Sequence, residues 1–429
     1  MFRSLRAPFA SLEVRDFRYL WLGMAFGHVG FWMQFVAQGW LAYDLTGSAT
    51  FLGLVSAAGG VPGILLMLPG GVLADRFARR GLLIGTNAAM AVCALVLALT
   101  LWAGVLDPWL LLVIVVVNAS ASALNLPARQ SLGPQLVGPA LVSNTIALMA
   151  VSFNVSRWLG PALAGALIVA VGTVGAFAAQ TGCLFLATAF TIAIGQEPPR
   201  DPLTRSRSVG RSLLDGIQYV WHEPIVRGAV VIALLHNGLG LLYAQLMPVF
   251  AGDVFKIGAG GLGALMSSIG VGATAGAFAA SFLSAYPRKG LAVFVTGVGC
   301  SIAMFVFAIV PWPIVAMVAL VILGGLQVLS MTATQMILNL TTPDEYRGRA
   351  MSVYMLTWNA APLSALPAGW IADRVGAPAT IGGSAIITLA GFLAAAVLLG
   401  GVRRFRDEPA ILESLDARRE PQRGALARS

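Results

Sequence analysis

The sequence has little charge: only 10% of its 429 residues are Asp, Glu, Lys or Arg. A soluble domain carries roughly 25% charged residues, spread along the chain. Lysine is especially scarce, because Lys256 and Lys289 are the only two, against 25 arginines. This excess of arginine indicates a GC-rich bacterial genome. The shortage of charge excludes an ordinary soluble globular protein.

Patterns that support enzyme chemistry are also missing. Cys93, Cys183 and Cys300 lie singly in apolar runs, so they form neither a disulfide framework nor a metal site. A GxxxxGK[ST] loop is absent, and the GxGxxG at 258–263 follows no predicted strand. We therefore reject nucleotide sites. No Ser-His-Asp, Cys-His or zinc arrangement is present either, and we expect no enzyme activity, metal or cofactor.

The chain instead contains long hydrophobic runs, with 58% hydrophobic residues and a mean hydropathy of +0.83. A run of about 20 apolar residues crosses a bilayer core of ~30 Å as a helix. The first run is too long for the apolar segment of a cleaved signal peptide. The expected spans are residues 17–43, 49–73, 81–104, 109–128, 140–171, 174–195, 225–251, 260–284, 289–310, 312–339, 349–372 and 378–401.

This pattern predicts an all-α integral membrane protein with twelve transmembrane helices. The start, the loops after even-numbered spans and the tail hold 24 of the 27 basic residues. The positive-inside rule therefore places both termini in the cytoplasm. The net charge of +9 lies beside membrane ends, so we expect membrane lipid and no nucleic acid as a partner. We expect the protein to lie in the inner membrane of a bacterium.

The longest polar interval divides the spans into two halves. We expect a six-helix bundle over 1–195, a cytoplasmic linker over 196–224, a second six-helix bundle over 225–402 and a basic cytoplasmic tail over 403–429. From Arg211 the linker becomes amphipathic, which predicts a helix on the inner membrane surface, or simply a linker helix. Its apolar face consists of Leu213, Leu214, Ile217, Val220 and Trp221.

The strongest local motif is GVLADRFARR at residues 71–80, between spans 2 and 3. Gly71 permits close approach of a neighbouring helix, and Asp75 can face the positive N-terminus of a helix. The arginines that follow suit the membrane interface. A basic turn that merely obeys the positive-inside rule explains the motif equally well.

The run resembles the signature loop of the major facilitator superfamily and stands in the same loop. It matches at Gly71, Asp75, Arg76, Arg79 and Arg80 and differs at Ala78, where the family usually has glycine. The resemblance covers all twelve spans and implies the major facilitator fold, with this loop as a conformational switch. Residues 125–130, 154–165 and 343–349 resemble the branch of enterobactin exporters, macrolide-efflux proteins and transmembrane secretion effectors.

Two further patterns follow from this resemblance. Gly160 and Pro161, with Gly165 after them, resemble a span-5 motif of exporters, although a simple proline kink is the alternative. Residues 68–76 also resemble residues 366–374. Spans 2 and 11 run in opposite directions, so only nested three-span inverted repeats, as described for this superfamily, can pair them. Chance similarity over nine residues competes with that explanation.

Polar residues inside the spans mark a candidate substrate pathway, because each is costly in lipid unless it faces protein or water. In span 4, Asn118, Ser122, Asn125 and Arg129 form one stripe. Span 1 places His28, Trp32 and Phe35 on one helical face, and span 7 repeats this spacing with His236, Gly240 and Tyr243. Hydrogen bonding between helices is the alternative. The other candidates are His28 and Trp32 in span 1, Asn154 and Arg157 in span 5, and Gln327, Ser330 and Thr334 in span 10.

Arg157 is the only strong charge deep in the predicted membrane core, and no Asp or Glu lies near mid-membrane. It either binds backbone and amide oxygens near Gly160 or faces a watery cavity that takes an anion. His28 and His236 are the only embedded groups that titrate near neutral pH. They are the candidates for proton coupling, against which the lack of embedded carboxylates weighs.

We therefore expect a secondary active exporter of a small amphiphilic compound, such as a siderophore, a macrolide or another drug-like molecule. It works by alternating access, as a monomer and with antiport as its mode. An importer of a small organic solute is one alternative. A non-transporting scaffold or sensor is another, but a scaffold would fill the polar positions in the spans with Leu or Ala.

Overall fold

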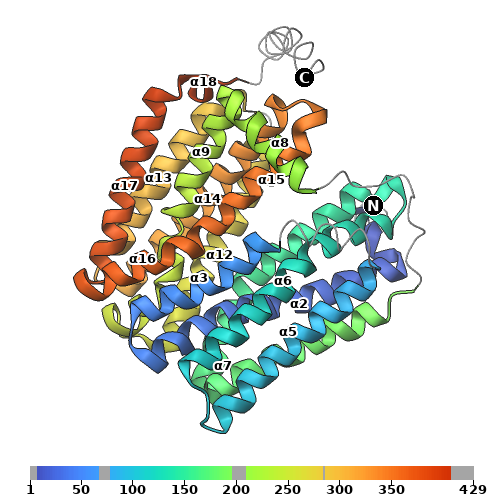
Figure 1. Cartoon of the computed structure of the whole chain (residues 1–429), viewed down its shortest axis with the longest axis vertical. Helices are drawn as coiled ribbons and strands as arrows, with labels where there is room; N and C mark the ends of the chain where they lie inside the picture. The colour runs from blue at the N-terminus through green and yellow to red at the C-terminus, as the bar shows by residue number, and fades with distance from the viewer. Residues whose placement is uncertain (1–6, 67–77, 196–208, 284–285, 407–429) are drawn as a thin grey trace.

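The computed structural model describes residues 7–66, 78–195, 209–283 and 286–406, and every regular element in these ranges is a helix. Gly71, Asp75 and Arg76 of the predicted switch loop lie outside the described residues. Two groups of helices form the protein (Figure 1). They are called here the N-terminal group, α2 to α7, and the C-terminal group, α9 to α17.

The N-terminal group begins after a short 3-10 helix, η1 (Ala7–Glu13). Local sequence sets several of its helix ends. Gly47 ends α2 with a φ of 61°, which favours glycine, and the Ser48 side chain caps α3. Asp107 accepts hydrogen bonds from two backbone N–H groups at the start of α6. The helices are α2 (Arg15–Thr46), α3 (Ala49–Leu65), α5 (Arg79–Trp102), α6 (Pro108–Gln135) and α7 (Val142–Ile192).

The C-terminal group follows the helix α8 (Val209–His222). It contains α9 (Pro224–Gly238), α10 (Leu242–Gln245), α11 (Met247–Val249), the π-helix η3 (Phe250–Val254), α12 (Gly258–Leu283), α13 (Lys289–Ile309), α14 (Pro313–Thr341), α15 (Asp344–Leu356), the 3-10 helix η4 (Thr357–Asn359), α16 (Ala360–Val375), α17 (Ala377–Leu398) and α18 (Gly400–Arg403).

In the described residues, nine helices are long and apolar enough to cross a membrane. One of these, Pro139–Ile192, covers both span 5 and span 6 of the prediction, and α7 bends within it at Gly172, where φ is 75°. The segment Ala49–Leu65 is a shorter apolar helix. The all-helical membrane fold is therefore confirmed, and the count of twelve stays a prediction.

Two predicted spans are interrupted. Span 11 is divided into α15, η4 and α16. Span 7 breaks after Gly238, so the continuous face expected for His236, Gly240 and Tyr243 is wrong. The backbone turns back so closely at Gly240 that a Cβ there would lie 2.5 Å from the carbonyl oxygen of His236. His236 and Tyr243 consequently contact different parts of the C-terminal group.

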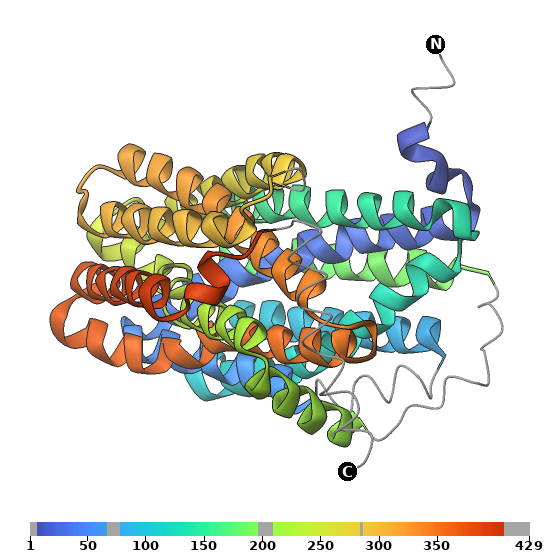
Figure 2. The ribbon, with the colours of Figure 1, turned by 90° about the horizontal axis from the view of Figure 1, so that it is seen from above.

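The two groups meet along two pairs of helices, α3 with α16 and α7 with α12 (Figures 1 and 2). Small residues make both approaches possible. A Cβ at Gly369 would lie 2.1 Å from the carbonyl oxygen of Ala49, and one at Gly165 would lie 2.9 Å from the Cα of Gly263. Such small-residue contacts allow helix backbones to pack closely in a membrane.

Candidate functional site

Arg157 of α7 joins the two helix groups in the middle of the protein. Its Nη2 donates a hydrogen bond of 2.9 Å to Oε1 of Gln327 on α14. No ion pair of Arg157 is found within the described ranges. The sequence left two possibilities open for Arg157: backbone and amide oxygens near Gly160, or a watery cavity that takes an anion. Its contact is an amide oxygen, but this oxygen belongs to the C-terminal group. A single amide acceptor leaves most of the five N–H donors of the guanidinium free.

Aromatic side chains surround this arginine. The guanidinium carbon lies 5.8 Å from the ring centroid of Trp32 on α2, a cation–π distance. Trp32 in turn contacts Phe31, Phe35 and Phe153. Its Nε1 is buried and has no acceptor in the described part of the chain. The result is a pair of underused donors, Arg157 and Trp32, beside an apolar aromatic surface.

Tyr243 and His28 extend the same cluster on either side. Tyr243 is fully buried in α10 and interacts with both Arg157 and Gln327. His28 lies on the other side, where its Nδ1 is 3.1 Å from Oγ of Ser152 on α7. The imidazole is also edge-on to Phe153. His28 is therefore held by a hydrogen bond inside the N-terminal group, while Tyr243 lies at the junction of the groups.

Asn118 belongs to a buried amide network that was only partly expected. Its Nδ2 donates to Oε1 of Gln34 on α2 at 3.1 Å, and Nε2 of Gln180 on α7 donates to the same oxygen at 3.0 Å. Nε2 of Gln34 in turn donates a hydrogen bond to Oε1 of Gln38 at 3.0 Å. Gln34 and Gln180 were missed by the sequence analysis, although an embedded glutamine in span 1 or span 6 is as costly in lipid as an asparagine in span 4.

The remaining predicted residues of span 4 and Asn154 show different environments. Asn125 donates to Thr86 Oγ1 at 2.8 Å and to Asn87 Oδ1 at 2.9 Å, both on α5. This is hydrogen bonding between helices. Asn154 donates to the carbonyl of Ala150 in its own helix. Ser122 is half-buried. A pathway role for these side chains stays a prediction.

His236 lies with Ser330 and Thr334 in a second place, inside the C-terminal group. These residues line a small pocket of about 10 Å³ together with Asn237 and Tyr354. Both ring nitrogens of His236 are buried without a hydrogen-bond partner in the described residues. Thr334 donates to the carbonyl of Ser330. A buried polar atom without a partner costs free energy, so this pocket suits a water molecule or a polar ligand atom.

The span-5 motif lies where α7 packs against two other helices. Gly160 faces α2, since a Cβ there would lie 2.5 Å from Cβ of Trp32. Pro161 and Gly165 instead face α12: the carbonyl oxygen of Pro161 would lie 2.7 Å from a Cβ at Gly263. The motif therefore sets the distance between α7 of one group and α12 of the other.

We expect Gly165→Ala to lower the melting temperature, because its methyl group would lie 2.9 Å from the Cα of Gly263. Overpacking of this kind costs about 1–3 kcal/mol. Gly182→Ala is the matched control, since the same substitution in the same helix meets no atom within 4 Å. Thermal unfolding of both variants in detergent measures the difference, and equal shifts would contradict the close α7–α12 contact.

Polar contacts outside the predicted set close the ends of the helices that we expect to face outward. Asp373, near the end of α16, accepts four hydrogen bonds at the N-terminus of α3. They come from Ser48 Oγ (2.8 Å), Ala49 N (2.7 Å), Thr50 N (2.9 Å) and Thr50 Oγ1 (2.5 Å). Asp373 is thus an anion at a positive helix end. The repeat of residues 68–76 at 366–374 was the signal that could have found it.

A second contact lies beside the first. The Tyr43 hydroxyl, near the end of α2, hydrogen-bonds the carboxylate of Asp253 in η3. Within the described ranges, the hydrogen bonds between the two groups all involve residues between mid-span and the expected outer ends. The groups are therefore fastened together on that side.

The described part of the predicted switch loop begins at the start of α5. Arg80 donates to the carbonyl oxygens of Thr191 at 3.3 Å and Ile192 at 2.5 Å. A cation is favoured at this helix C-terminus, where backbone carbonyls lack partners. Arg79 is the first residue of α5. Arg80 thus ties the start of α5 to the end of α7.

The fold is that of major facilitator transporters. The structure superposes on a bacterial homologue of the human lysosomal transporter Spinster, in an inward-facing and unoccupied conformation, with a TM-score of 0.73 at 14% identity, covering 92% of this chain and 98% of that one. The nucleoside transporter NupG gives a TM-score of 0.70 at 13% identity, with 91% and 100% covered. These likenesses show the fold of the chain.

Residues 6–418 match the transmembrane secretion effector family, and the chain belongs to that family. It is 26% identical over 356 residues to the multidrug efflux pump Tap of Mycolicibacterium fortuitum, covering 80% of this chain and 86% of Tap. It is 27% identical over 387 residues to the enterobactin exporter EntS of Shigella boydii serotype 18 (strain CDC 3083-94 / BS512), covering 88% and 87%. The expected superfamily and branch are confirmed, and the protein is a multi-pass bacterial membrane protein.

Proposed function

We propose that this protein exports a small amphiphilic compound that carries an acidic or electronegative group, by alternating access of its two helix groups. The observation that carries the proposal is Arg157, which is bonded across the groups to Gln327 and keeps free donors beside Trp32. An anionic group of the substrate would take the place of the weak amide acceptor. The neighbouring aromatic rings would contact its apolar part.

Alternating access requires the groups to separate first on one side and then on the other. The contacts of Asp373 and Tyr43 close the expected outer side, which supports an inward-facing state. We propose that the loop of Gly71 and Asp75 closes the opposite side in the other state. The halves moving in this way correspond to residues 1–195 and 225–402, joined by the linker 196–224.

Two observations support export in preference to import. The chain is similar to the efflux pump Tap and the exporter EntS, and Gly165 of the span-5 motif packs on α12. Import of a small organic solute is the alternative direction. A non-transporting scaffold is disfavoured because Arg157, Gln34 and Gln180 place costly polar groups where leucine would suffice. We propose a monomer and no enzyme activity. If protons drive export by antiport, His28 and His236 are the residues that would carry them.

The orientation proposed is an inner-membrane protein with both termini in the cytoplasm and a basic tail at 403–429. Reporter fusions after Arg80, Arg205 and Ser429 should be active in the cytoplasm, and fusions near Pro108 and Lys256 should be active outside it, because 24 of the 27 basic residues lie on the first side. Paired cytoplasmic and periplasmic reporters at each site measure this. External activity at Arg205 would contradict the proposed orientation.

The function is tested by efflux from cells that express the protein or lack it. Cells are loaded with a catecholate siderophore, a macrolide or a cationic dye, and retained compound is measured over time. Expression should lower retention of the acidic or electronegative compounds, and Arg157→Gln at matched protein level should restore it. If cells with and without the protein retain all of these compounds equally, the protein does not export them and the proposal is refuted.

A further inference from the structure

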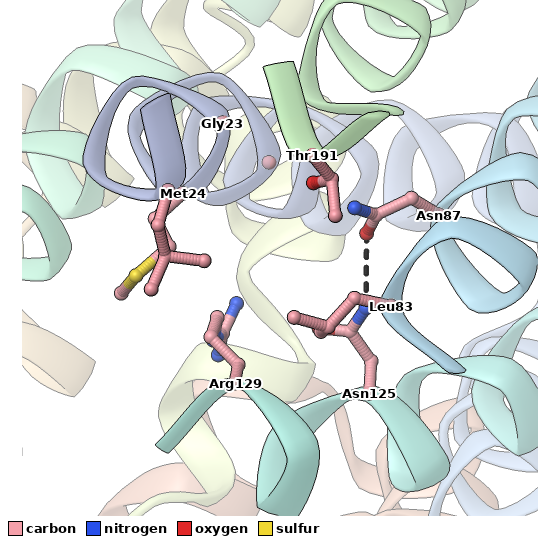
Figure 3. Close-up of a pocket in the computed structure, with 9 residues that line it drawn as sticks. Gly23, Met24, Leu83, Asn87, Asn125, Arg129 and Thr191 are labelled. Atoms are coloured by element: carbon pink, nitrogen blue, oxygen red, sulfur yellow. Dashed lines mark hydrogen bonds between the residues drawn. The ribbon is translucent and has the colours of Figure 1, made fainter. Parts of the chain in front are cut away.

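A second arginine, Arg129, faces a pocket that is separate from the Arg157 cluster. The pocket lies inside the N-terminal group, between α2, α5, α6 and the end of α7. Figure 3 shows the Arg129 side chain directed from α6 into this space, with Asn87 and Thr191 opposite. The free space is about 20 Å³. It fits one charged group of a ligand, and not a whole drug-sized molecule.

The charge of Arg129 is uncompensated. Within the described ranges its guanidinium makes no hydrogen bond or ion pair, and no lining residue of the pocket is acidic. Arg129 is also only partly exposed to solvent. Arg80 and Arg157 differ from it, because Arg80 donates to helix carbonyls and Arg157 donates to Gln327. A half-buried cation without an acceptor favours binding of an anion.

A second donor points into the same space. Asn125 Nδ2 donates to Oδ1 of Asn87 at 2.9 Å, which fixes the orientation of the Asn87 amide. Its Nδ2 is consequently turned away from Asn125 and toward the pocket (Figure 3). Asn125 is itself fixed by a second bond to Thr86. Arg129 and Asn87 therefore offer converging donors to one acceptor group.

We propose that this pocket binds an oxyanion, a carboxylate or a phosphate group, held by the Arg129 guanidinium with Asn87 Nδ2 as the second donor. A planar guanidinium forms two parallel hydrogen bonds with either group. The chemistry is the same for a soluble anion and for the phosphate of an anionic lipid. The site lies wholly within one helix group, so it stands whether or not Arg157 contacts the exported substrate.

The test uses the purified full-length protein in an uncharged detergent, with inorganic phosphate titrated against sodium chloride at constant ionic strength. Phosphate should raise the melting temperature of the wild type in a saturable way. Arg129→Gln should weaken the apparent affinity by at least about tenfold. Arg129→Lys, which keeps the charge but not the fork geometry, should lie between the two. Arg404→Gln, at an exposed arginine outside both clusters, is the control and should respond like the wild type.

The lipid source is tested in nanodiscs that contain either zwitterionic phosphatidylcholine alone or added phosphatidylglycerol. If the phosphate of an anionic lipid fills the pocket, phosphatidylglycerol stabilises the wild type but not Arg129→Gln, and added inorganic phosphate has no further effect. Asn87→Ala, which removes the second donor, covers the case in which Arg129→Gln does not fold. Equal responses of the wild type, Arg129→Gln and Asn87→Ala to both ligands would overturn the site. Loss of the response in Arg157→Gln alone would assign the anion to the central cluster.

Discussion

Asp373→Asn is expected to separate the two helix groups on their outer side. The carboxylate of Asp373 accepts hydrogen bonds from the side chains and backbone at the start of α3. Asparagine removes the negative charge that the positive helix end favours. At an exposed position this interaction is worth about 0.3–1 kcal/mol, and about 2 kcal/mol in partly buried geometries. Asp373 is exposed, and a loss of about 0.3–1 kcal/mol changes the equilibrium between the two states roughly 2- to 5-fold.

The change is measured as the distance between spin labels on the two groups. Val105 and Trp312 are exposed beside the expected outer ends of α5 and α14, and labels there report separation directly. Cys93, Cys183 and Cys300 are first replaced, so that only the introduced cysteines react. The Asp373→Asn protein should show a larger population at the long distance, together with slower efflux.

Ser48→Ala provides the matched control for this experiment. It removes one of the four donors to Asp373 and also the side-chain cap of α3, but it leaves the carboxylate and the other three donors in place. Its distance distribution should therefore lie between those of the wild type and Asp373→Asn. An unchanged distribution in Asp373→Asn would show that glycine packing along α3 and α16 is sufficient to close the outer side.

Arg157→Gln is expected to abolish export of the acidic substrate and to spare a cationic one. Hydrogen bonds to a charged group are worth about 1.5–3 kcal/mol, so loss of the guanidinium should weaken binding by about 10- to 100-fold. Arg157→Lys keeps the charge and should retain part of the activity. Transport of one anionic and one cationic compound, at matched protein level, separates the two substrates.

Gln327→Glu distinguishes a substrate contact from a structural one. The new carboxylate would lie at the position of Oε1, which is 2.9 Å from Arg157 Nη2, and would pair with the guanidinium across the two groups. We expect a higher melting temperature and slower export, because the substrate must then displace an ion pair. If Arg157→Gln and Gln327→Glu lower the melting temperature alike and inhibit both substrates equally, Arg157 is structural.

The fold could be predicted because lipid makes hydrophobic length a strong signal: a helix crossing ~30 Å needs about 20 apolar residues. The interruption of span 7 gave no such signal. Residues 225–251 are predominantly apolar, and the break near Gly240 depends on how α9 and α10 pack, which hydropathy does not encode. The span-4 pattern was similarly incomplete. It identified Asn118 but not which helix supplies its acceptor, Gln34.

Contacts between distant segments were the least predictable part of the site. Arg157 was recognised as a costly embedded charge, yet its acceptor, Gln327, lies 170 residues away in the sequence. Asp373 was present in the repeat, but its role depends on which state of the transporter brings α16 against α3. One sequence must specify both states of the transporter, whereas a contact such as that of Asp373 with α3 is expected in only one of them.

The helix α8 packs against the C-terminal group. Asp215 pairs with Arg349 of α15 at 3.6 Å, and the rings of Tyr219 and Tyr346 stack at 4.6 Å. Its exposed apolar side chains, Leu214 and Trp221 among them, suit the headgroup region of a bilayer. We therefore expect α8 to hold the C-terminal group at the membrane surface and to limit its tilting. In the frame of the bilayer, the N-terminal group would perform the larger part of the rocking motion.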